Sequence, residues 1–241
     1  MISRAPLGLC FALFAIACSR LKAPEPSAPV SDTTGEIAGV RYLEHMTGGA
    51  RADERVPMII VLHPMGGDPT DMLQMFQRYP RRARLILPYG QASGGKWRWY
   101  ESVREDVAAS VVTREADRLA SAITALVAAR PTVGKPVVTG FSQGGIMAFA
   151  LAVTHPDQFS AVFPMGGMLP PSLYPSTTIT SELPLIIAFH GASDLAVPTQ
   201  SARASITELR RAGFTAELRA YAGLQHDISD QELNDLFEQL E

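Results

Sequence analysis

Short apolar runs alternate with longer helical segments along most of this chain, and this alternation limits the choice of fold more than any other feature. Buried strands are expected at residues 57–62, 84–88, 136–139, 159–164, 184–189 and 216–221. Helices are expected at residues 104–130, 144–154, 201–212 and 230–240. Strands and helices that alternate in this way predict an α/β fold, with a mostly parallel central sheet and helices on both faces.

The length and composition fit one domain of this kind. A chain of 241 residues is long enough to build a core that keeps water out of a catalytic site. The formal charge is only -3 and no basic stripe follows the chain, so nucleic acid is not expected as a partner. No glycine-rich phosphate loop ends in lysine and no histidines are paired at metal spacing, so we expect no cofactor and no metal.

The first 17 residues have the pattern of a signal peptide. Arg4 gives a short positive start, and residues 7–17 form an apolar run too short to span a bilayer as a permanent helix. Ala15 and Ala17 match the small-residue pattern for cleavage before Cys18. The stretch is also similar to a bacterial lipobox, with Ala15 where leucine is usual. We expect export to the periplasm of a bacterium, or attachment to its outer membrane through a lipidated Cys18; the alternative is a buried N-terminal helix.

Both cysteines of the chain lie in this first segment, at Cys10 and Cys18. Cleavage before Cys18 would leave one thiol, so neither an internal disulfide nor a cysteine metal site is expected. Residues 18–35 are rich in proline and small polar residues, which predicts an extended tether. The catalytic domain is expected at residues 36–241.

The expected strand at 136–139 leads directly into Gly140-Phe141-Ser142-Gln143-Gly144, and a helix follows at once. In this position the G-x-S-x-G pattern predicts a nucleophile elbow. The serine would occupy a strained turn, while small neighbours let strand and helix approach each other. The hydroxyl would then project above the sheet near the helix N-terminus. The pentapeptide alone is weak, and the alternative is a capping serine in an ordinary turn.

A serine nucleophile needs a histidine base, and three histidines follow Ser142. His155 ends a helix and His190 ends a strand, whereas His226 lies in the loop between the last strand and the last helix. When the triad follows the chain order nucleophile, acid, histidine, the last of these positions is the one expected for the base. We therefore predict that His226 is the base.

The acid that orients the base should follow a strand between Ser142 and His226. Asp194 comes just after the expected strand at 184–189 and meets this condition. Asp157 lies at a helix end on the wrong side of the sheet, and Asp227 is adjacent to His226, so that their side chains diverge. We predict Asp194 as the acid.

Ester hydrolysis by such a triad also needs two donors for the oxyanion. One is expected to be the backbone N–H of Gln143, directly after the nucleophile. The other is expected to be the N–H of Met65 in His63-Pro64-Met65-Gly66-Gly67, the loop after the strand at 57–62. Glycines in this loop would permit a close backbone approach. The alternative is a plain glycine turn.

Taken together, these segments resemble the phospholipase/carboxylesterase family of α/β-hydrolases, which includes acyl-protein thioesterases. The resemblance covers about residues 56–240. It is carried by Ile59-Ile60-Val61-Leu62-His63 with Gly66-Gly67, by 97–101, by Gly140-Phe141-Ser142-Gln143-Gly144-Gly145, by His190-Gly191 with Asp194 and Val197-Pro198, and by His226 with Ile228, Glu232 and Leu233. Pro64 and Met65 depart from the usual family pattern, and typical family members lack an export signal.

The resemblance implies an α/β-hydrolase fold, no cofactor and a serine carboxylesterase that acts on a small-molecule ester. Apolar residues are expected to line the substrate site, namely Met65, Trp97, Trp99, Met168, Leu169 and Leu195. Polyester depolymerases and feruloyl esterases share a similar exported layout and are close alternatives. The sequence is also compatible with a peptidase on the same fold and with a non-catalytic surface lipoprotein.

Overall fold

The computed structural model describes residues 32–101, 109–180 and 182–240. The predicted signal peptide, Cys18 and most of the predicted tether lie outside these ranges, as do residues 104–108 of the predicted long helix. No helix in the described ranges is both long and apolar enough to cross a membrane.

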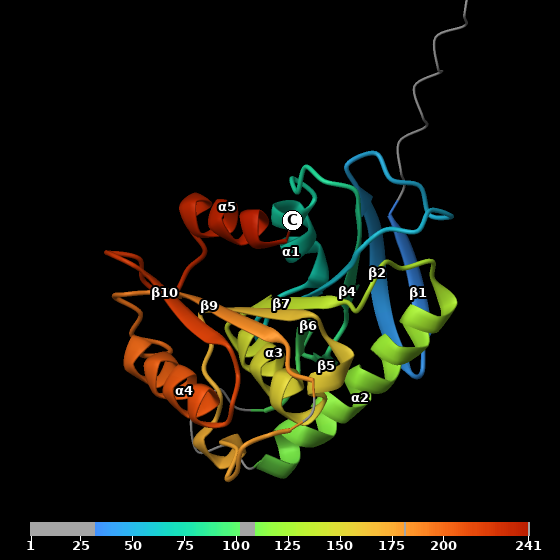
Figure 1. The fold of residues 1–241 in the computed structure, drawn as a ribbon. Helices are drawn as coiled ribbons and strands as arrows, with labels where there is room; N and C mark the ends of the chain where they lie inside the picture. Colours follow the sequence, from blue (N-terminus) through green and yellow to red (C-terminus); the bar gives the residue numbers. More distant parts are fainter. Residues whose placement is uncertain (1–31, 102–108, 181, 241) are drawn as a thin grey trace, which may run out of the picture.

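An eight-stranded sheet runs through the centre of the domain (Figure 1). Its strand order is β1 (Thr33–Ile37), β2 (Val40–Thr47), β4 (Ala83–Pro88), β3 (Met58–Leu62), β7 (Val137–Phe141), β8 (Ala161–Met165), β9 (Leu185–Gly191) and β10 (Ala216–Tyr221). The strands from β4 to β10 in this order are parallel, whereas β1 and β2 extend the sheet in antiparallel fashion. This confirms the predicted α/β-hydrolase fold with a mostly parallel sheet.

Helices cover both faces of the sheet, as expected (Figure 1). On one face lie α1 (Pro69–Phe76) and α5 (Asp230–Gln239), and on the other lie α2 (Ala109–Ala129), α3 (Gln143–Thr154) and α4 (Thr199–Arg211). Short 3-10 turns occur at Pro156–Gln158 and Pro171–Leu173. A separate hairpin is formed by β5 (Gln91–Ser93) and β6 (Lys96–Arg98).

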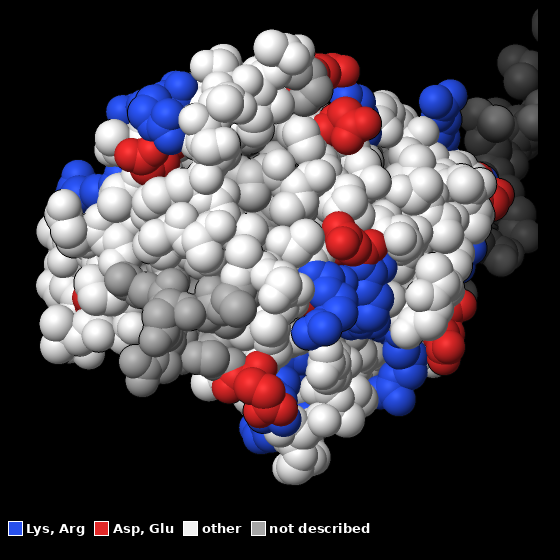
Figure 2. Space-filling view, turned by 90° about the horizontal axis from the view of Figure 1, so that it is seen from below, with Lys and Arg blue, Asp and Glu red and all other residues white. Residues whose placement is uncertain are grey.

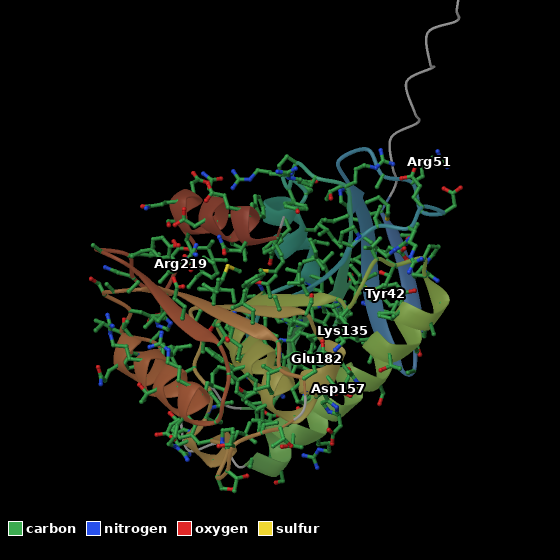
Figure 3. The ribbon with its side chains drawn as sticks, in the orientation of Figure 1. Tyr42, Arg51, Lys135, Asp157, Glu182 and Arg219 are labelled. Carbon is green, nitrogen blue, oxygen red and sulfur yellow. The ribbon has the colours of Figure 1, made fainter. Side chains whose placement is uncertain are left out.

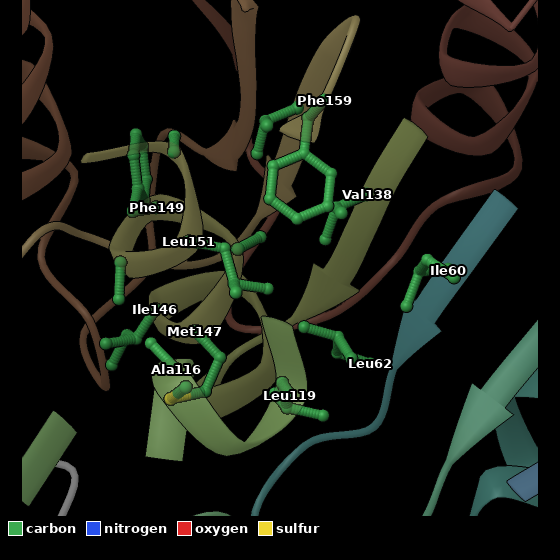
Figure 4. Packing of buried hydrophobic residues seen from close by; sticks show 14 of the residues in the cluster. Ile60, Leu62, Ala116, Leu119, Val138, Ile146, Met147, Phe149, Leu151 and Phe159 are labelled. Carbon is green, nitrogen blue, oxygen red and sulfur yellow. The ribbon is translucent and has the colours of Figure 1, made fainter. Parts of the chain in front are cut away.

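Each face of the sheet has its own hydrophobic core. Figure 4 shows the core under α2 and α3, with Ile60, Leu62, Val138, Ile146 and Phe149 among its members. In α3, every residue from Gln143 to Ala152 is buried, which fits a helix that is apolar on all sides. Because α3 begins immediately after Ser142, its burial fixes the position of the turn that holds this serine.

The domain begins earlier than the sequence predicted. Residues 33–35 belong to β1 and not to the tether, because Thr33 pairs with Glu44 and Gly35 pairs with Tyr42 of β2. This edge strand is mostly exposed, so it lacks the apolar pattern that identifies a buried strand. The sequence pattern also failed to indicate β2, α1 and the β5–β6 hairpin. The elements that it did predict differ at their ends by only a few residues, except where the ends lie outside the described ranges.

Charged side chains are scattered over the face shown in Figure 2. Lysine and arginine lie next to aspartate and glutamate in small mixed groups, with wide uncharged areas between them. This face therefore carries no continuous basic surface.

Candidate active site

The turn between β7 and α3 holds Ser142 in a conformation that serine rarely adopts. Its φ is 55° and its ψ is -116°, and its N–H donates to the carbonyl of Met165 at 3.0 Å. Positive φ in a residue with a side chain costs free energy and persists only where the surroundings impose it. Here the buried helix α3 and the parallel strand β8 impose it.

Small residues around the serine are a steric requirement. A Cβ added to Gly144 would lie 2.2 Å from the carbonyl oxygen of Leu62, and one added to Gly140 would lie 2.7 Å from the same oxygen. A Cβ on Gly145 would lie 2.5 Å from the carbonyl oxygen of Met165. The glycines therefore let α3 pack directly against β3 and β8, as the elbow interpretation predicts.

The structure brings Ser142, His226 and Asp194 together, although they are far apart in the chain. The Oγ of Ser142 lies 2.9 Å from Nε2 of His226, and Nδ1 of His226 lies 2.7 Å from Oδ2 of Asp194. Because a carboxylate oxygen only accepts hydrogen bonds, Nδ1 carries a proton and Nε2 is left as the acceptor for the serine hydroxyl. This is the tautomer that a general base needs.

Asp194 and His226 are each held by further contacts. Oδ1 of Asp194 accepts hydrogen bonds from the N–H groups of Ala196 and Val197, both at 2.9 Å. The ring of His226 lies against Phe141, with centroids 4.9 Å apart. The side chain of Asp194 is fully buried, whereas that of His226 is 25% exposed. Asp194 is thus shielded from solvent, while His226 remains partly exposed.

The other candidates for the acid and the base, Asp157, Asp227 and His155, have different surroundings. Asp157 is exposed in the 3-10 turn after α3, and Figure 3 shows it near Lys135 and Glu182. These two residues pair at 2.7 Å just before β7 and β9 begin, so Asp157 lies at the opposite end of the strands from the serine. Asp227 is exposed, and its Oδ1 accepts the N–H of Ile228. His155 ends α3 and pairs with Asp117.

The loop after β3 is shaped for close backbone contact. The N–H of Gly66 donates to the carbonyl of Trp97 at 2.8 Å, and that of Gly67 donates to Pro64 at 3.0 Å. Gly66 adopts a φ of 75°, which explains the glycine there. Within the described ranges, the N–H of Met65 has no hydrogen-bond acceptor. It is therefore a candidate oxyanion donor; the other predicted donor, the N–H of Gln143, lies at the start of α3.

Sequence reasoning missed the side chains that connect this loop to the elbow. The side chain of Gln143 is fully buried; its Oε1 accepts the N–H of Trp99, and its Nε2 donates to the carbonyl of Tyr100. Nε1 of Trp99 in turn donates to the carbonyl of His63, and the two rings stack at 4.5 Å. The glutamine in the elbow motif was a visible signal, but its partners could not be read from spacing.

His63 completes this support as a neutral ring. Its Nδ1 donates to the carbonyl of Pro64 at 2.8 Å, and its Nε2 accepts the N–H of Gly90 at 3.1 Å. Burial lowers the pKa of His63, which keeps the imidazole neutral and preserves this pair of hydrogen bonds. His63 therefore connects the loop after β3 to Gly90 through a neutral ring.

The predicted substrate-binding residues divide into surface and core positions. Met65 is 44% exposed and Leu195 is 92% exposed, while Trp97 is half-buried and donates to Asp68. Trp99, Met168 and Leu169 are at most 1% exposed. These three side chains belong to the hydrophobic core, which does not fit the expectation that they line an open substrate site. Met168 also borders a hollow beside α4 that Pro171 and Ala204 help to line.

Within the described ranges, no three His, Cys, Asp or Glu side chains are grouped closely enough to hold a metal ion.

Comparisons with known proteins agree with this geometry. The sequence profile of the family described as Phospholipase/Carboxylesterase matches residues 49–241. A probable SOBER1-like carboxylesterase from Arabidopsis thaliana is 33% identical over 98 residues, 40% of this chain and 37% of that protein. Putative esterase NocK from Nocardia uniformis subsp. tsuyamanensis is 30% identical over 164 residues, 61% of this chain and 45% of its own. The match thus spans less than half the length of both relatives.

Solved structures show the same fold. The crystal structure of a carboxylesterase from Mesorhizobium loti superposes with a TM-score of 0.69 at 18% identity, and the match covers 87% of this chain and 98% of that one. The profile match extends over most of the chain and includes the elbow, Asp194 and His226. The chain therefore belongs to the phospholipase/carboxylesterase family of α/β-hydrolases.

Proposed function

We propose that this protein is a serine carboxylesterase that hydrolyses carboxylic esters through an acyl-serine intermediate. The observation that carries the proposal is the unbroken hydrogen-bonded path from Asp194 through His226 to the strained Ser142. A capping serine in an ordinary turn would need neither the positive φ nor the two partners. Family membership supports ester hydrolysis as the reaction class.

The proposed reaction has two steps. Ser142 Oγ attacks the ester carbonyl while His226 Nε2 takes its proton, and the resulting imidazolium is balanced by Asp194. The N–H groups of Met65 and Gln143 stabilise the oxyanion. Collapse of the tetrahedral intermediate releases the alcohol, which takes its proton from His226. Water then attacks the acyl-serine by the same route in reverse, releasing the acid and restoring Ser142.

The proposed substrate is a small-molecule ester with an acyl or aryl group of modest size. Exposed Met65 lies in the oxyanion loop and exposed Leu195 follows Asp194, so apolar side chains flank the triad. Polyester and feruloyl ester hydrolysis use the same chemistry and remain alternatives, as does a peptidase. A non-catalytic lipoprotein is less well supported, because a binding role needs no aligned triad.

We further propose that the protein is exported in a bacterium, to the periplasm or to the outer membrane through a lipidated Cys18. This proposal rests on Arg4, on the apolar run of residues 7–17 and on the small residues before Cys18.

The decisive experiment compares the wild-type protein with Ser142→Ala. We expect the wild type to react with a fluorophosphonate probe and to hydrolyse p-nitrophenyl esters, with a preference for some acyl chain lengths. Ser142→Ala should fold normally, fail to label and lose at least about a thousandfold in kcat. If the variant retained a large share of the wild-type turnover, the proposal would be wrong. If the wild type cleaved amides faster than matched esters, the peptidase alternative would replace it.

A further inference from the structure

His190 lies directly behind the acid of the proposed triad, and the proposed mechanism gives it no task. It is the penultimate residue of β9, four positions before Asp194, and its side chain is fully buried. Nε2 of His190 lies 2.8 Å from the carbonyl oxygen of Val197 and 3.3 Å from Oδ2 of Asp194. The same Oδ2 accepts the hydrogen bond from His226. Two histidines therefore share one carboxylate oxygen.

The partners of His190 determine its protonation. A carbonyl oxygen only accepts hydrogen bonds, so Nε2 must carry a proton. Nδ1 is buried and makes no hydrogen bond of normal geometry within the described ranges, although the backbone of Gly167 lies near the ring. Burial has the largest effect on the pKa of His190 and lowers it; the backbone of Val197, the charge of Asp194 and the backbone of Gly167 act against this shift, and His226 acts with it. The ring is therefore the neutral Nε2–H tautomer at neutral pH.

A neutral donor suits this place better than a cation. An imidazolium or a lysine beside Asp194 would cancel much of the negative charge that stabilises protonated His226. The neutral ring adds only a dipole, with its hydrogen directed between Val197 O and Asp194 Oδ2. It also connects the end of β9 to Val197, and thus closes the loop that carries Asp194.

The contacts of Asp194 show which motion this closure prevents. Oδ1 is held by the N–H groups of Ala196 and Val197, which belong to the same loop as Asp194 itself. These two bonds would follow the loop if it moved. The bond from His190 joins the far end of the loop, at Val197, to β9. The start of the loop is tied to the sheet separately, because the N–H groups of Ala192 and Asp194 donate to the carbonyls of Tyr221 and Gly191.

We propose that His190 is a positioning residue for the esterase reaction: its Nε2–H holds the loop of residues 192–197 against β9 and so fixes the Asp194 carboxylate opposite His226. The inference rests on the proposed function, since it assigns a role within the proposed triad.

The test compares His190→Phe, which keeps a ring but removes the donor, with His190→Gln, whose amide N–H reaches about the position of Nε2. We expect His190→Phe to lower kcat on an activated ester by on the order of ten- to a hundredfold, with KM changed by less than about twofold. The acid limb of its pH–rate profile should move to lower pH, because a displaced carboxylate favours protonated His226 less. His190→Gln should restore most of kcat and the position of the limb.

Two controls separate positioning from a general loss of stability. His155→Gln removes another histidine that pairs with a carboxylate, away from the triad, and should leave kcat and the pH profile unchanged. In an Asp194→Asn background, His190→Phe should lower kcat by less than about twofold, because the two changes act through one interaction. If His190→Phe kept the wild-type kcat and pH profile, or if His190→Gln were no better than His190→Phe, the inference would be overturned.

A measurement on the wild-type full chain keeps the test valid if His190→Phe does not fold. The ¹⁵N chemical shifts of the His190 ring should report a neutral Nε2–H tautomer from about pH 7 to pH 9, because burial lowers its pKa from the ordinary value. A ring that titrates within this window, or that carries its proton on Nδ1, would contradict the inference. Failure of the esterase proposal itself would instead appear as full activity in Ser142→Ala.

Discussion

Glu232, in the first turn of α5, has surroundings unusual for a carboxyl group. It stands three residues after the N-cap Ser229, whose side chain accepts its N–H at 3.1 Å. A Ser-x-x-Glu sequence at this position normally forms a capping box, in which the glutamate reaches back to the serine N–H. Here the carboxyl group is fully buried, and within the described ranges neither of its oxygens makes a hydrogen bond of normal geometry, although the backbone of Ser229 lies near enough to lower its pKa. Burial is the main cause that raises the pKa of Glu232 to about 7, and Asp227 and Asp194 add to it.

Glu232→Gln should therefore stabilise the protein at high pH only. The folded state holds this proton more tightly than the unfolded state, where the pKa is about 4.5. Stability is consequently lost as the pH rises from about 4.5 to about 7, by at most about 3 kcal/mol. Urea unfolding should show Glu232→Gln to be neutral near pH 5 and more stable than wild type at pH 8. Glu238→Gln, on the exposed face of the same helix, should match wild type at both values. Equal stabilisation at both pH values would refute this account.

Asp194 should be distinguishable from its competitors by turnover. Asp194→Asn leaves His226 in place but removes the charge that sets its tautomer, so kcat should fall by on the order of a hundredfold or more with little change in KM. Asp157→Asn should be nearly silent, because Asp157 is exposed at the other end of the strands. Asp227→Asn should be intermediate at most. Measuring kcat and KM of all three variants on one ester, with thermal unfolding as a check on folding, would show which aspartate is the acid. If Asp194→Asn kept the wild-type kcat, Asp194 would not be the acid of the triad.

At the scale of secondary-structure elements, the sequence predicted the strands that form short apolar runs and missed elements whose pattern is interrupted. The strands β3, β4, β7, β8 and β9 appear as apolar runs because helices cover both faces of the sheet there. The edge strand β10 was predicted although it is only partly buried. β2 was missed because charges interrupt its pattern: Glu44 is buried, yet it pairs with Arg84 and Arg130. A buried ion pair cannot be recognised from one of its members. Likewise, α1 is short and begins with proline, so it resembled a loop.

Some residues of the candidate site could be predicted from the sequence and others could not. Ser142, Asp194 and His226 could be predicted because each follows a strand and their order along the chain is constrained. The contacts that connect the elbow to the loop after β3 could not be predicted, because Gln143, Trp99 and His63 come from segments that are far apart in the sequence. Trp99 was accordingly predicted as a substrate residue, whereas it lies in the core. A tryptophan in a loop gives no sign of which side it faces.

The elbow should tolerate no Cβ at Gly144. In Gly144→Ala the new atom would meet the backbone oxygen of Leu62 at 2.2 Å, so α3 would have to move away from β3. We expect a loss of about 1–3 kcal/mol in stability and a larger fractional loss of kcat than stability explains. Gly49→Ala, where the Cβ meets nothing within 4 Å but φ is also positive, controls for a general glycine effect. Normal turnover in folded Gly144→Ala would show that the elbow geometry is not required.

At the scale of the whole molecule, the described domain has one central eight-stranded sheet with helices on both faces, and the proposal of export rests on the chain that precedes it. Expressed in a Gram-negative host, the full chain should lose its first 17 residues. Intact-mass measurement would distinguish a diacylglyceryl group on Cys18, which supports the lipid anchor, from cleavage without lipid, which supports soluble export. Replacing Cys18 with serine should abolish any lipid mass. An uncleaved chain in the cytosol would contradict both forms of the proposal.

The backbone of Ser142 also sets a trade-off between stability and function at this one position. Its positive φ costs about 1–3 kcal/mol, a cost that glycine would not incur. A protein selected only for stability would therefore be expected to carry glycine here. Ser142→Gly should be inactive yet more stable than the equally inactive Ser142→Ala, because only glycine relieves the turn. Under the proposed function, the strained turn would be retained because the reaction needs a hydroxyl group there.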